Sequence, residues 1–224
     1  MRPLDLEYML GLVPVLLKYV PLTLAMASVA MILALVLASL MAVVRVVRVP
    51  LLDGFVQFFI SFFRGTPLLV QLFLFYYGLP QVFSSLTAIN GVTAAIMGIT
   101  LHFAAYMAES IRAAILGVDR SQWEASLSVG MTTPQMMRRI VLPQAARIAA
   151  PTLVNYFVDI IKSTSLAFTL GVTELMGAAQ KEAAGSFLYF EAFILVALIY
   201  WVIVEALTIV QRQLEARLGK AVAR

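Results

Sequence analysis

The residues best placed for chemistry are charged side chains inside long apolar runs. Asp159 and Lys162 interrupt the run at residues 151–172 and stand three positions apart. On a helix they would share one face and could form an ion pair that holds the helix against its neighbours. Lys162, with Ser163 and Ser165 nearby, could instead line a path through the protein, where its ammonium meets a carboxylate. Both readings stay open, because charges at such positions serve either purpose.

Other polar residues also fall inside apolar runs. His102 lies within residues 91–114, where it is either a satisfied interior histidine or a hydrogen-bond partner for a bound ligand. Glu109 and Arg112 are three apart near the end of the same run, so we expect a local ion pair. Glu205 has no obvious partner nearby. One short group predicts a structural break and a packing point beside a gate: Arg64, Gly65, Thr66 and Pro67.

Several kinds of chemistry are excluded by the residues that the chain lacks. It has no cysteine and one histidine, so there is no thiolate metal site, no cysteine nucleophile and little basis for a histidine triad. It also lacks a Gly-x-x-x-x-Gly-Lys-[Ser/Thr] phosphate loop and a zinc-ligand spacing. We therefore expect a non-enzyme that binds no metal and no cofactor of its own.

The composition shows which elements must position these side chains. Of 224 residues, 62% are hydrophobic and 12% are charged, whereas about 25% are charged in soluble proteins. Mean hydropathy is +0.95, and two uncharged stretches exceed the roughly 20 residues that a bilayer helix needs. We predict an all-α membrane protein with about five transmembrane helices in one domain, residues 19–210. The predicted spans are 19–44, 55–78, 91–114, 151–172 and 187–210, the second being one helix with an irregularity at 64–67.

The basic residues orient these spans in the membrane. Twelve of them fall on one side, namely Arg45, Arg48, Arg64, Arg112, Arg120, Arg138, Arg139, Arg147, Arg212, Arg217, Lys220 and Arg224. The other side holds only Arg2, Lys18 and Lys181. Because cytoplasmic loops carry the excess of Lys and Arg, residues 1–18 are expected outside and the tail, 211–224, in the cytoplasm. The net charge of +4 thus reflects orientation and gives no indication of nucleic-acid binding.

The polar stretch at residues 117–147 is too charged to cross a membrane and predicts a cytoplasmic loop of two short helices. Ser121 and Glu124 have the spacing of a capping box that starts the first helix. Gly130 suits the left-handed position that ends it. Thr133 and Pro134 suit the N-cap and first position of a second helix.

Pro143 is expected to end or kink that second helix. Taken alone, the loop would also fit an ordinary amphipathic helix lying at the membrane interface.

The spacing within this loop resembles the EAA loop of ABC-transporter permeases. The matching residues are Glu124-Ala125-Ser126, then Gly130, then Ile140-Val141-Leu142-Pro143, with Ser126 standing where the usual residue is alanine. Further stretches resemble the permeases for polar amino acids, namely residues 63–69, 76–80, 105–109 and 162–166. The likeness extends from about residue 19 to the end of the fifth predicted span.

This resemblance implies the fold of a type I ABC importer permease in the cytoplasmic (inner) membrane of a prokaryote. It also implies a second permease copy or a homologous partner, a cytoplasmic ABC ATPase dimer that binds ATP and Mg, and an external or periplasmic amino-acid-binding protein, all within membrane lipid. The loop helix would fit a groove of the ATPase. The cargo would be a polar amino acid; the likeness leans toward cystine and leaves glutamine, glutamate, histidine, arginine and opines open.

Two other functions compete with this interpretation. A proton-coupled secondary amino-acid transporter would use Glu109, Asp159 and Glu205 as carriers, although paired repeats with broken helices are hard to find in five spans. A membrane scaffold or sensor subunit that transports nothing would leave the charges inside the apolar runs unexplained.

Overall fold

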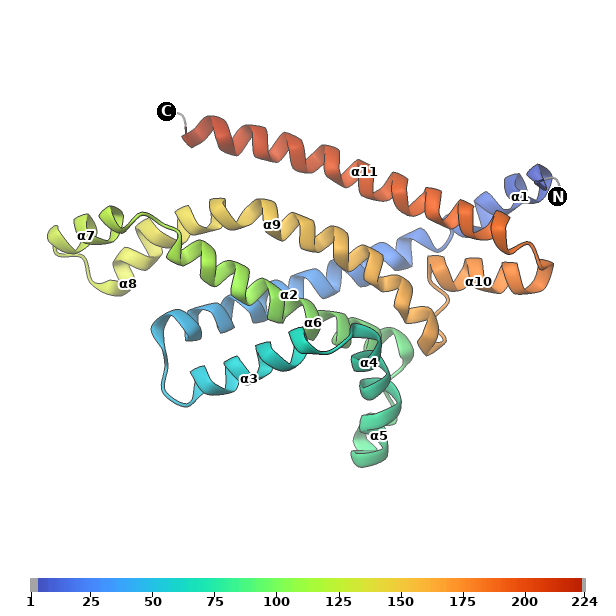
Figure 1. The fold of residues 1–224 in the computed structure, drawn as a ribbon, viewed down its shortest axis with the longest axis horizontal. Helices are drawn as coiled ribbons and strands as arrows, with labels where there is room; N and C mark the ends of the chain where they lie inside the picture. Colours follow the sequence, from blue (N-terminus) through green and yellow to red (C-terminus); the bar gives the residue numbers. More distant parts are fainter. Residues whose placement is uncertain (1–3, 223–224) are drawn as a thin grey trace.

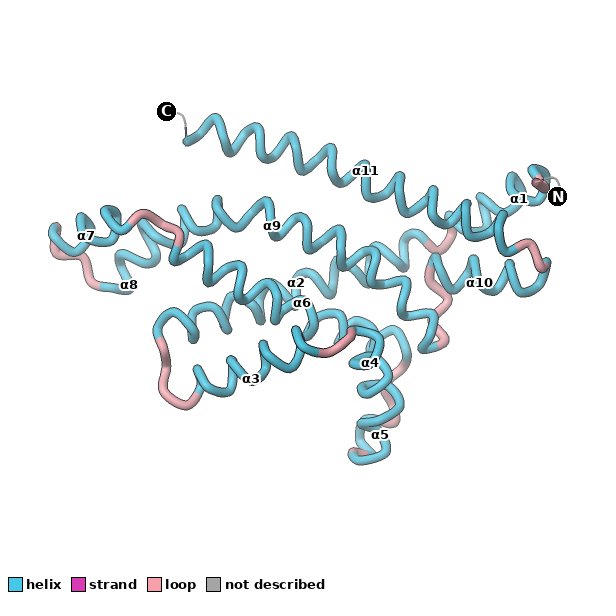
Figure 2. The backbone as a smooth tube through the Cα atoms, viewed as in Figure 1, coloured by secondary structure: helices cyan, strands magenta, loops and turns pink. Residues whose placement is uncertain are grey.

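The computed structural model describes residues 4–222, and within them the chain forms helices and turns without a strand (Figures 1 and 2). The α-helices are α1 Leu6–Leu17, α2 Val20–Val47, α3 Leu52–Gly65, α4 Leu68–Phe73, α5 Leu79–Val82, α6 Gly91–Leu116, α7 Arg120–Ser128, α8 Thr133–Met136, α9 Leu142–Ser163, α10 Leu175–Ser186 and α11 Tyr189–Val222. Two π turns, Leu74–Gly78 and Met137–Val141, and two 3-10 segments, Ser84–Leu86 and Thr164–Leu170, connect some of them. The all-α prediction is confirmed.

Three helices among the described residues are long and apolar enough to cross a membrane: α2, α6 and the Tyr189–Ile209 part of α11. A fourth crossing is possible for the bent pair formed by α3 and the segment Leu68–Val82. The helix α9, which carries Arg147, Asp159 and Lys162, is not among these apolar spans. The predicted total of five therefore depends on α9 crossing as well.

The main core lies where α2, α6, α9 and α3 meet. One face of α2 presents alanines that are fully buried, Ala27, Ala30, Ala34 and Ala38, and they pack against small residues of α6 such as Ala104 and Ala105. Small side chains let helix backbones approach closely, which is how helices associate when lipid removes the hydrophobic drive between them. This core fixes the positions of α6 and α9.

A second core joins α1, α10 and α11. It contains Leu12 and Leu16 of α1, Leu175 and Ala179 of α10, and Ala192 of α11. Tyr200 and Ile203 of α11 pack against both cores. In Figure 1 the start of α11 lies beside α1 and α10, and α11 then runs back along α9 in the opposite chain direction. The molecule thus has two helix units that meet along α9 and α11.

The second predicted span is wrong as a single helix, because α3 and the segment Leu68–Val82 meet at an angle of 110°. Thr66 is extended, with φ −121° and ψ 146°, since the residue before a proline is driven out of the helical region. Pro67 also has no N–H to continue the helix. The expected irregularity at residues 64–67 is present, but it ends one helix and starts another.

Three predicted boundaries also need correction. The fourth span was expected to start at residue 151, but α9 begins at Leu142 and keeps Pro151 inside it, so the loop at 117–147 is shorter than predicted. After Ser163 the chain tightens into the 3-10 segment Thr164–Leu170 instead of continuing as α-helix to residue 172. At the C-terminus, α11 extends through most of the predicted tail, to Val222.

Candidate functional site

The polar loop that follows α6 begins with a helix whose N-cap was not predicted from the sequence. Asp119 is the N-cap of α7, and its carboxylate accepts a hydrogen bond from the Ser121 backbone N–H at 2.8 Å. This bond holds the pKa of Asp119 below its ordinary value. The predicted capping box of Ser121 and Glu124 is therefore wrong, because the helix starts two residues earlier than predicted and Ser121 lies inside its first turn.

The end of α7 is confirmed at Gly130. This glycine has φ +79°, its N–H donates to the Leu127 carbonyl at 2.9 Å, and the next N–H, that of Met131, donates to the Ser126 carbonyl at 3.1 Å. These two bonds form a Schellman motif, which satisfies carbonyls that the helix end would otherwise leave free. The turn between α7 and α8 is consequently rigid.

The start of the second short helix is displaced by one residue from the prediction. Thr132 is the N-cap of α8, in place of Thr133, and its N–H donates to the Gln135 side chain at 3.0 Å. Pro134 lies in the first turn. The chain then stays helical through Pro143, because the π turn Met137–Val141 directly precedes it and α9 starts at Leu142.

The EAA-like residues lie together at one end of the molecule, where α7 packs against the π turn that contains Ile140 (Figure 1). Glu124 and Ala125 are exposed, whereas Ser126 is buried, and its hydroxyl donates to the Gln122 carbonyl at 2.6 Å. The serine in place of the usual alanine is thus satisfied within its own helix. Ile140 is half-buried, and Leu142 and Pro143 are exposed at the start of α9.

This end of the molecule offers an apolar surface with charged edges. Leu127 and Val129 are 54% and 73% exposed. A cavity of about 540 Å³ is lined by Leu116, Val118, Arg120, Trp123 and Glu124. A capped helix that exposes apolar side chains beside a hollow suits docking to another protein.

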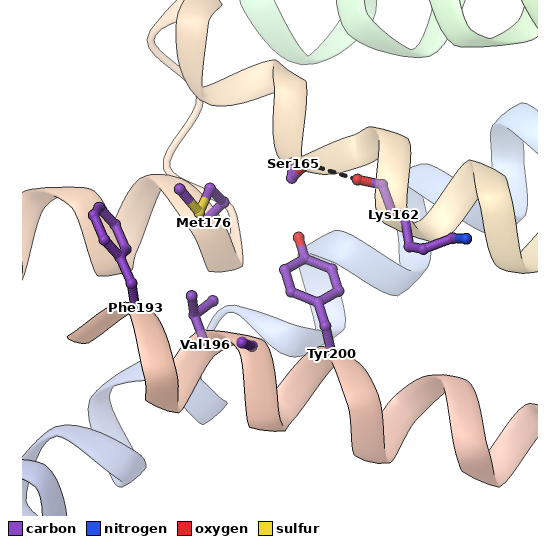
Figure 3. A pocket seen from close by; sticks show the side chains of 7 residues that line it. Lys162, Ser165, Met176, Phe193, Val196 and Tyr200 are labelled. Atoms are coloured by element: carbon purple, nitrogen blue, oxygen red, sulfur yellow. Dashed lines mark hydrogen bonds between the residues drawn. The ribbon is translucent and has the colours of Figure 1, made fainter. Parts of the chain in front are cut away.

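The ion pair predicted in the fourth span forms. The Lys162 Nζ lies 2.6 Å from the Asp159 Oδ1, and the two side chains are 56% and 49% exposed. Lys162 also borders a cavity of about 350 Å³ together with Ser165, Met176, Phe193, Val196, Ala197 and Tyr200 (Figure 3). In Figure 3 the stem of Lys162 borders this cavity while its amine points away from Tyr200. Ser163 is half-buried on the same turn and does not line the cavity.

His102 lies away from this cavity, at the bend between α3 and α4. Its Nδ1 is 3.1 Å from the Oε1 of Gln71, a side chain that is 1% exposed. The Gln71 amide also donates to the carbonyls of Phe63 and Thr66 at 3.0 and 3.1 Å, and to the Thr66 hydroxyl at 2.8 Å. Gln71 therefore satisfies carbonyls that the break before Pro67 leaves free.

Gln71 was not predicted from the sequence, although a lone amide in an apolar run soon after a proline is a usable signal. The rest of the bend is tied to α6 by Tyr106. Its hydroxyl donates to the Arg64 carbonyl at 3.3 Å, and the Arg64 guanidinium carbon lies 5.4 Å from the centre of its ring. Gly65 has open space where a side chain would lie, so it does not cause the bend.

The pair of Glu109 and Arg112 forms as predicted, with the Arg112 Nη2 2.7 Å from the Glu109 Oε2, and belongs to a larger network. Arg45 at the end of α2 lies 3.7 Å from Glu109 through its Nε, and its Nη1 lies 2.8 Å from the Oδ1 of Asp53. Arg45 and Asp53 were not predicted as partners. The network joins α2, α3 and α6.

A second missed residue is Glu174, the N-cap of α10, which is fully buried. Its carboxylate accepts hydrogen bonds from the Gly177 N–H at 2.8 Å, the Tyr200 hydroxyl at 3.0 Å and the Thr23 hydroxyl at 3.4 Å. An acidic residue just before a short helix rich in alanine was the available signal.

The sequence and fold both match known proteins. The family model described as the binding-protein-dependent transport system inner membrane component matches residues 13–220. The chain is 62% identical to the "Probable amino-acid ABC transporter permease protein PatM" of Vibrio harveyi, over 98% of this chain and 99% of that protein. It is 35% identical to the L-cystine transport system permease protein TcyL of Bacillus subtilis, over 90% of this chain and 86% of that one.

Among solved structures, one chain from a crystal structure of an amino acid ABC transporter with histidines superposes with a TM-score of 0.90 at 30% identity, covering 96% of this chain and all of that one. A chain of the MetNI methionine ABC transporter superposes with a TM-score of 0.69 at 21% identity, covering 88% of this chain and 95% of that one, which shows the fold alone. With the helical fold, the EAA-like loop and these matches in agreement, the chain belongs to the binding-protein-dependent inner membrane component family, among the permeases of amino-acid ABC transporters.

Proposed function

We propose that this chain is the permease subunit of an ATP-driven importer that carries a polar amino acid across the inner membrane of a prokaryote. The observation that carries the proposal is the two-helix cytoplasmic loop, whose EAA-like residues are held rigidly at one end of an amino-acid permease fold. A rigid loop of this kind can transmit a conformational change from a separate ATPase to the transmembrane helices.

In this proposal α7 docks on a cytoplasmic ABC ATPase dimer, which binds ATP and Mg. The exposed Leu127 and Val129 supply apolar contact area, and Glu124 supplies a charged anchor beside the hollow at Trp123. The π turn that contains Ile140 packs against α7 and supports it, and Leu142 and Pro143 follow this turn as the exposed first residues of α9. The Schellman turn at Gly130 keeps this block rigid, so movement of the ATPase is passed on to α9.

The complete transporter would contain a second permease, as an identical copy or a homologous partner, and an external binding protein that delivers the amino acid. The excess of Lys and Arg in the loops and tail supports an external N-terminus and a cytoplasmic C-terminus. The name of the relative TcyL favours cystine as the cargo to test first.

Lys162 is the side chain that we place on the substrate path, with Asp159, Ser163, Ser165 and His102 as further polar groups. An amino acid is a zwitterion, and its carboxylate would compete with Asp159 for the Lys162 ammonium. This exchange is feasible because the ion pair is about half exposed and the stem of Lys162 borders a cavity, into which the flexible side chain can turn its ammonium. His102 would meet the substrate at another point of the path, because it contacts Gln71 at the bend between α3 and α4.

The test is reconstitution of the chain with its ATPase and binding protein in proteoliposomes. Uptake of labelled L-cystine, L-glutamine and L-arginine is measured with ATP enclosed, with a non-hydrolysable ATP analogue, and with a proton gradient alone. We expect uptake with ATP only, and we expect it to persist when a protonophore removes the gradient. Uptake driven by the gradient without ATP would overturn the importer and favour the proton-coupled transporter.

A further inference from the structure

Glu174 is a buried carboxylate that the proposed transport path does not use. It lies between the two helix units, at the start of α10, with 0% of its surface exposed. A carboxylate removed from water is costly unless several donors satisfy it. One of its oxygens, Oε1, accepts the Gly177 N–H at 2.8 Å, a bond that caps its own helix.

The other oxygen, Oε2, connects Glu174 to two more helices. It accepts the Tyr200 hydroxyl of α11 at 3.0 Å and the Thr23 hydroxyl of α2 at 3.4 Å. The Thr23 oxygen in turn accepts the Leu175 N–H at 3.2 Å. Because all of these contacts join different helices, they fix the Tyr200 ring relative to both units.

Tyr200 is also a wall of the cavity that Lys162 borders (Figure 3). Lys162 and Ser165 come from α9 and the 3-10 segment that follows it, whereas Met176, Phe193, Val196 and Ala197 come from α10 and α11. The volume of about 350 Å³ lies within the range of roughly 300 to 1,000 Å³ that small-molecule sites occupy. Lys162 is the one charged side chain in this lining.

We propose that Glu174 is a positioning residue that holds Tyr200 as one wall of the Lys162 cavity, and that this cavity selects amino acids whose side chains carry no net charge. The inference rests on the proposed substrate path. The carboxylate of the amino acid would reach Lys162, while its side chain would pack against Tyr200, Phe193 and Met176. A basic side chain that packs against Tyr200, Phe193 and Met176 would find no acidic partner there, because Asp159 lies beside Lys162 and is not part of the lining.

The absence of cysteine from the chain provides a direct probe of this cavity. Ser165→Cys introduces a single thiol into its lining. The rate at which a maleimide alkylates this thiol measures how accessible the cavity is to the reagent. In lipid nanodiscs, we expect Glu174→Gln and Tyr200→Phe each to change this rate about three- to tenfold, as loss of one hydrogen bond allows. If Glu174 acts through Tyr200, the double variant changes the rate no further than either single one.

Matched controls separate this role from a general effect of burial. Glu191 is a second buried carboxylate, 6% exposed, that faces the Asp5 N–H at 3.5 Å and is outside the cavity lining. Tyr8 accepts a hydrogen bond from the Ser186 hydroxyl at 3.0 Å in the same helix unit. Glu191→Gln and Tyr8→Phe should leave the alkylation rate unchanged. An equal effect of these controls, or additive effects of Glu174→Gln and Tyr200→Phe, would overturn the proposal.

Ligand selection is tested on the same thiol and on the complete transporter. L-Glutamine should slow alkylation of the Ser165→Cys chain more than L-arginine does, and the reverse order would contradict the selectivity. In proteoliposomes with ATPase and binding protein, Tyr200→Phe and Glu174→Gln should raise the KM for L-glutamine about three- to tenfold at an unchanged maximal rate. A fall in maximal rate alone would indicate a structural role and overturn the positioning role.

The two proposals fail in distinguishable ways. If the wild-type complex takes up none of the amino acids, the proposed import is wrong, and the alkylation rates still decide whether Glu174 positions Tyr200. If uptake requires ATP and the alkylation rates of the Glu174 and Tyr200 variants equal that of the parent, import stands and the role of Glu174 is wrong.

Discussion

The polar loop between α6 and α9 and the interior of the helix bundle satisfy their polar groups in opposite ways. In the loop the partners are close in sequence: Ser121 bonds to Asp119 and Ser126 to Gln122. In the interior they come from distant parts of the chain, as in the contact of Gln71 with His102 and that of Glu174 with Thr23. The loop can therefore form its structure locally, whereas the interior depends on helices that are already in place.

This difference separates two kinds of failure. Damage to the loop should leave the bundle folded and weaken only what docks on α7. Replacing a buried polar residue such as Gln71 or Glu174 should disturb several helices at once, because each of them bonds to at least one other helix. The following variants test this separation, starting with the one from which we expect the largest effect.

Replacing Gln71 by leucine should have the largest effect. The variant leaves the carbonyls of Phe63 and Thr66 without the amide that satisfies them, and it removes the partner of the His102 ring. Each buried polar group that loses its partner costs about 1–3 kcal/mol, so a total of about 3 kcal/mol or more is expected. Thermal unfolding in nanodiscs measures the loss.

The matched control for Gln71→Leu is Gln57→Leu. Gln57 is an exposed glutamine of α3 whose amide bonds only to the neighbouring Asp53, at 2.7 Å. Its replacement should change the unfolding temperature little. Equal losses for both variants would show that the bend needs no special polar support, and the contrast between the loop and the interior would fail.

The next largest effect is expected at Gly130, and it should appear in docking. Valine is strained at φ +79° by roughly 1–2 kcal/mol, whereas asparagine tolerates this region. Gly130→Val should therefore lower co-purification with the ATPase and ATP-driven uptake, while Gly130→Asn retains most of both. Both variants should unfold at the temperature of the parent chain, since the strain is confined to the loop. A large drop in that temperature for Gly130→Val would contradict the independence of the loop.

A smaller and more selective effect is expected for Lys162. Lys162→Ala, which removes the ammonium, should raise the KM for amino-acid uptake about tenfold, the effect of losing one hydrogen bond to a charged group. Assembly with the ATPase should be unchanged, because Lys162 is far from α7 along the chain and its ion pair is half exposed. Lys181→Ala, at an exposed lysine of α10, is the control and should leave the KM unaltered. Impaired assembly with a normal KM would support the structural pair in place of the substrate path.

The same contrast explains which features could be predicted from the sequence. The ion pairs Asp159–Lys162 and Glu109–Arg112 and the helix end at Gly130 depend on residues within a few positions, and all three are present. The caps of α7 and α8 were displaced by one or two residues, because neighbouring acceptors compete for the same backbone N–H groups.

The buried polar residues that join helices, Gln71 and Glu174, were missed because the local sequence marks each residue but does not specify its distant partners. Gln71 and Glu174 each appear as a single polar residue near an apolar run, and their partners lie 31 and 151 positions away. The sequence before Pro67 indicated a break but not its angle of 110°, and the Gln71 amide that bonds to the Thr66 carbonyl at this bend was not predicted. The start of α9 was placed too late because the π turn lets helix continue through Pro143.

Ser126 should give the smallest effect, although it is buried and belongs to the EAA-like group. Its hydroxyl donates within α7, to the Gln122 carbonyl at 2.6 Å. Ser126→Ala removes this buried hydroxyl together with its requirement for a hydrogen-bond partner, so the free energy of unfolding should change by less than about 0.5 kcal/mol. Ser126→Leu, at the same buried position, should instead displace α7 from the π turn and reduce ATPase binding. Measured binding affinities that fall equally for both variants would mean that the hydroxyl contacts the ATPase itself. The loop would then satisfy its polar groups partly through its partner, as the interior does through distant helices.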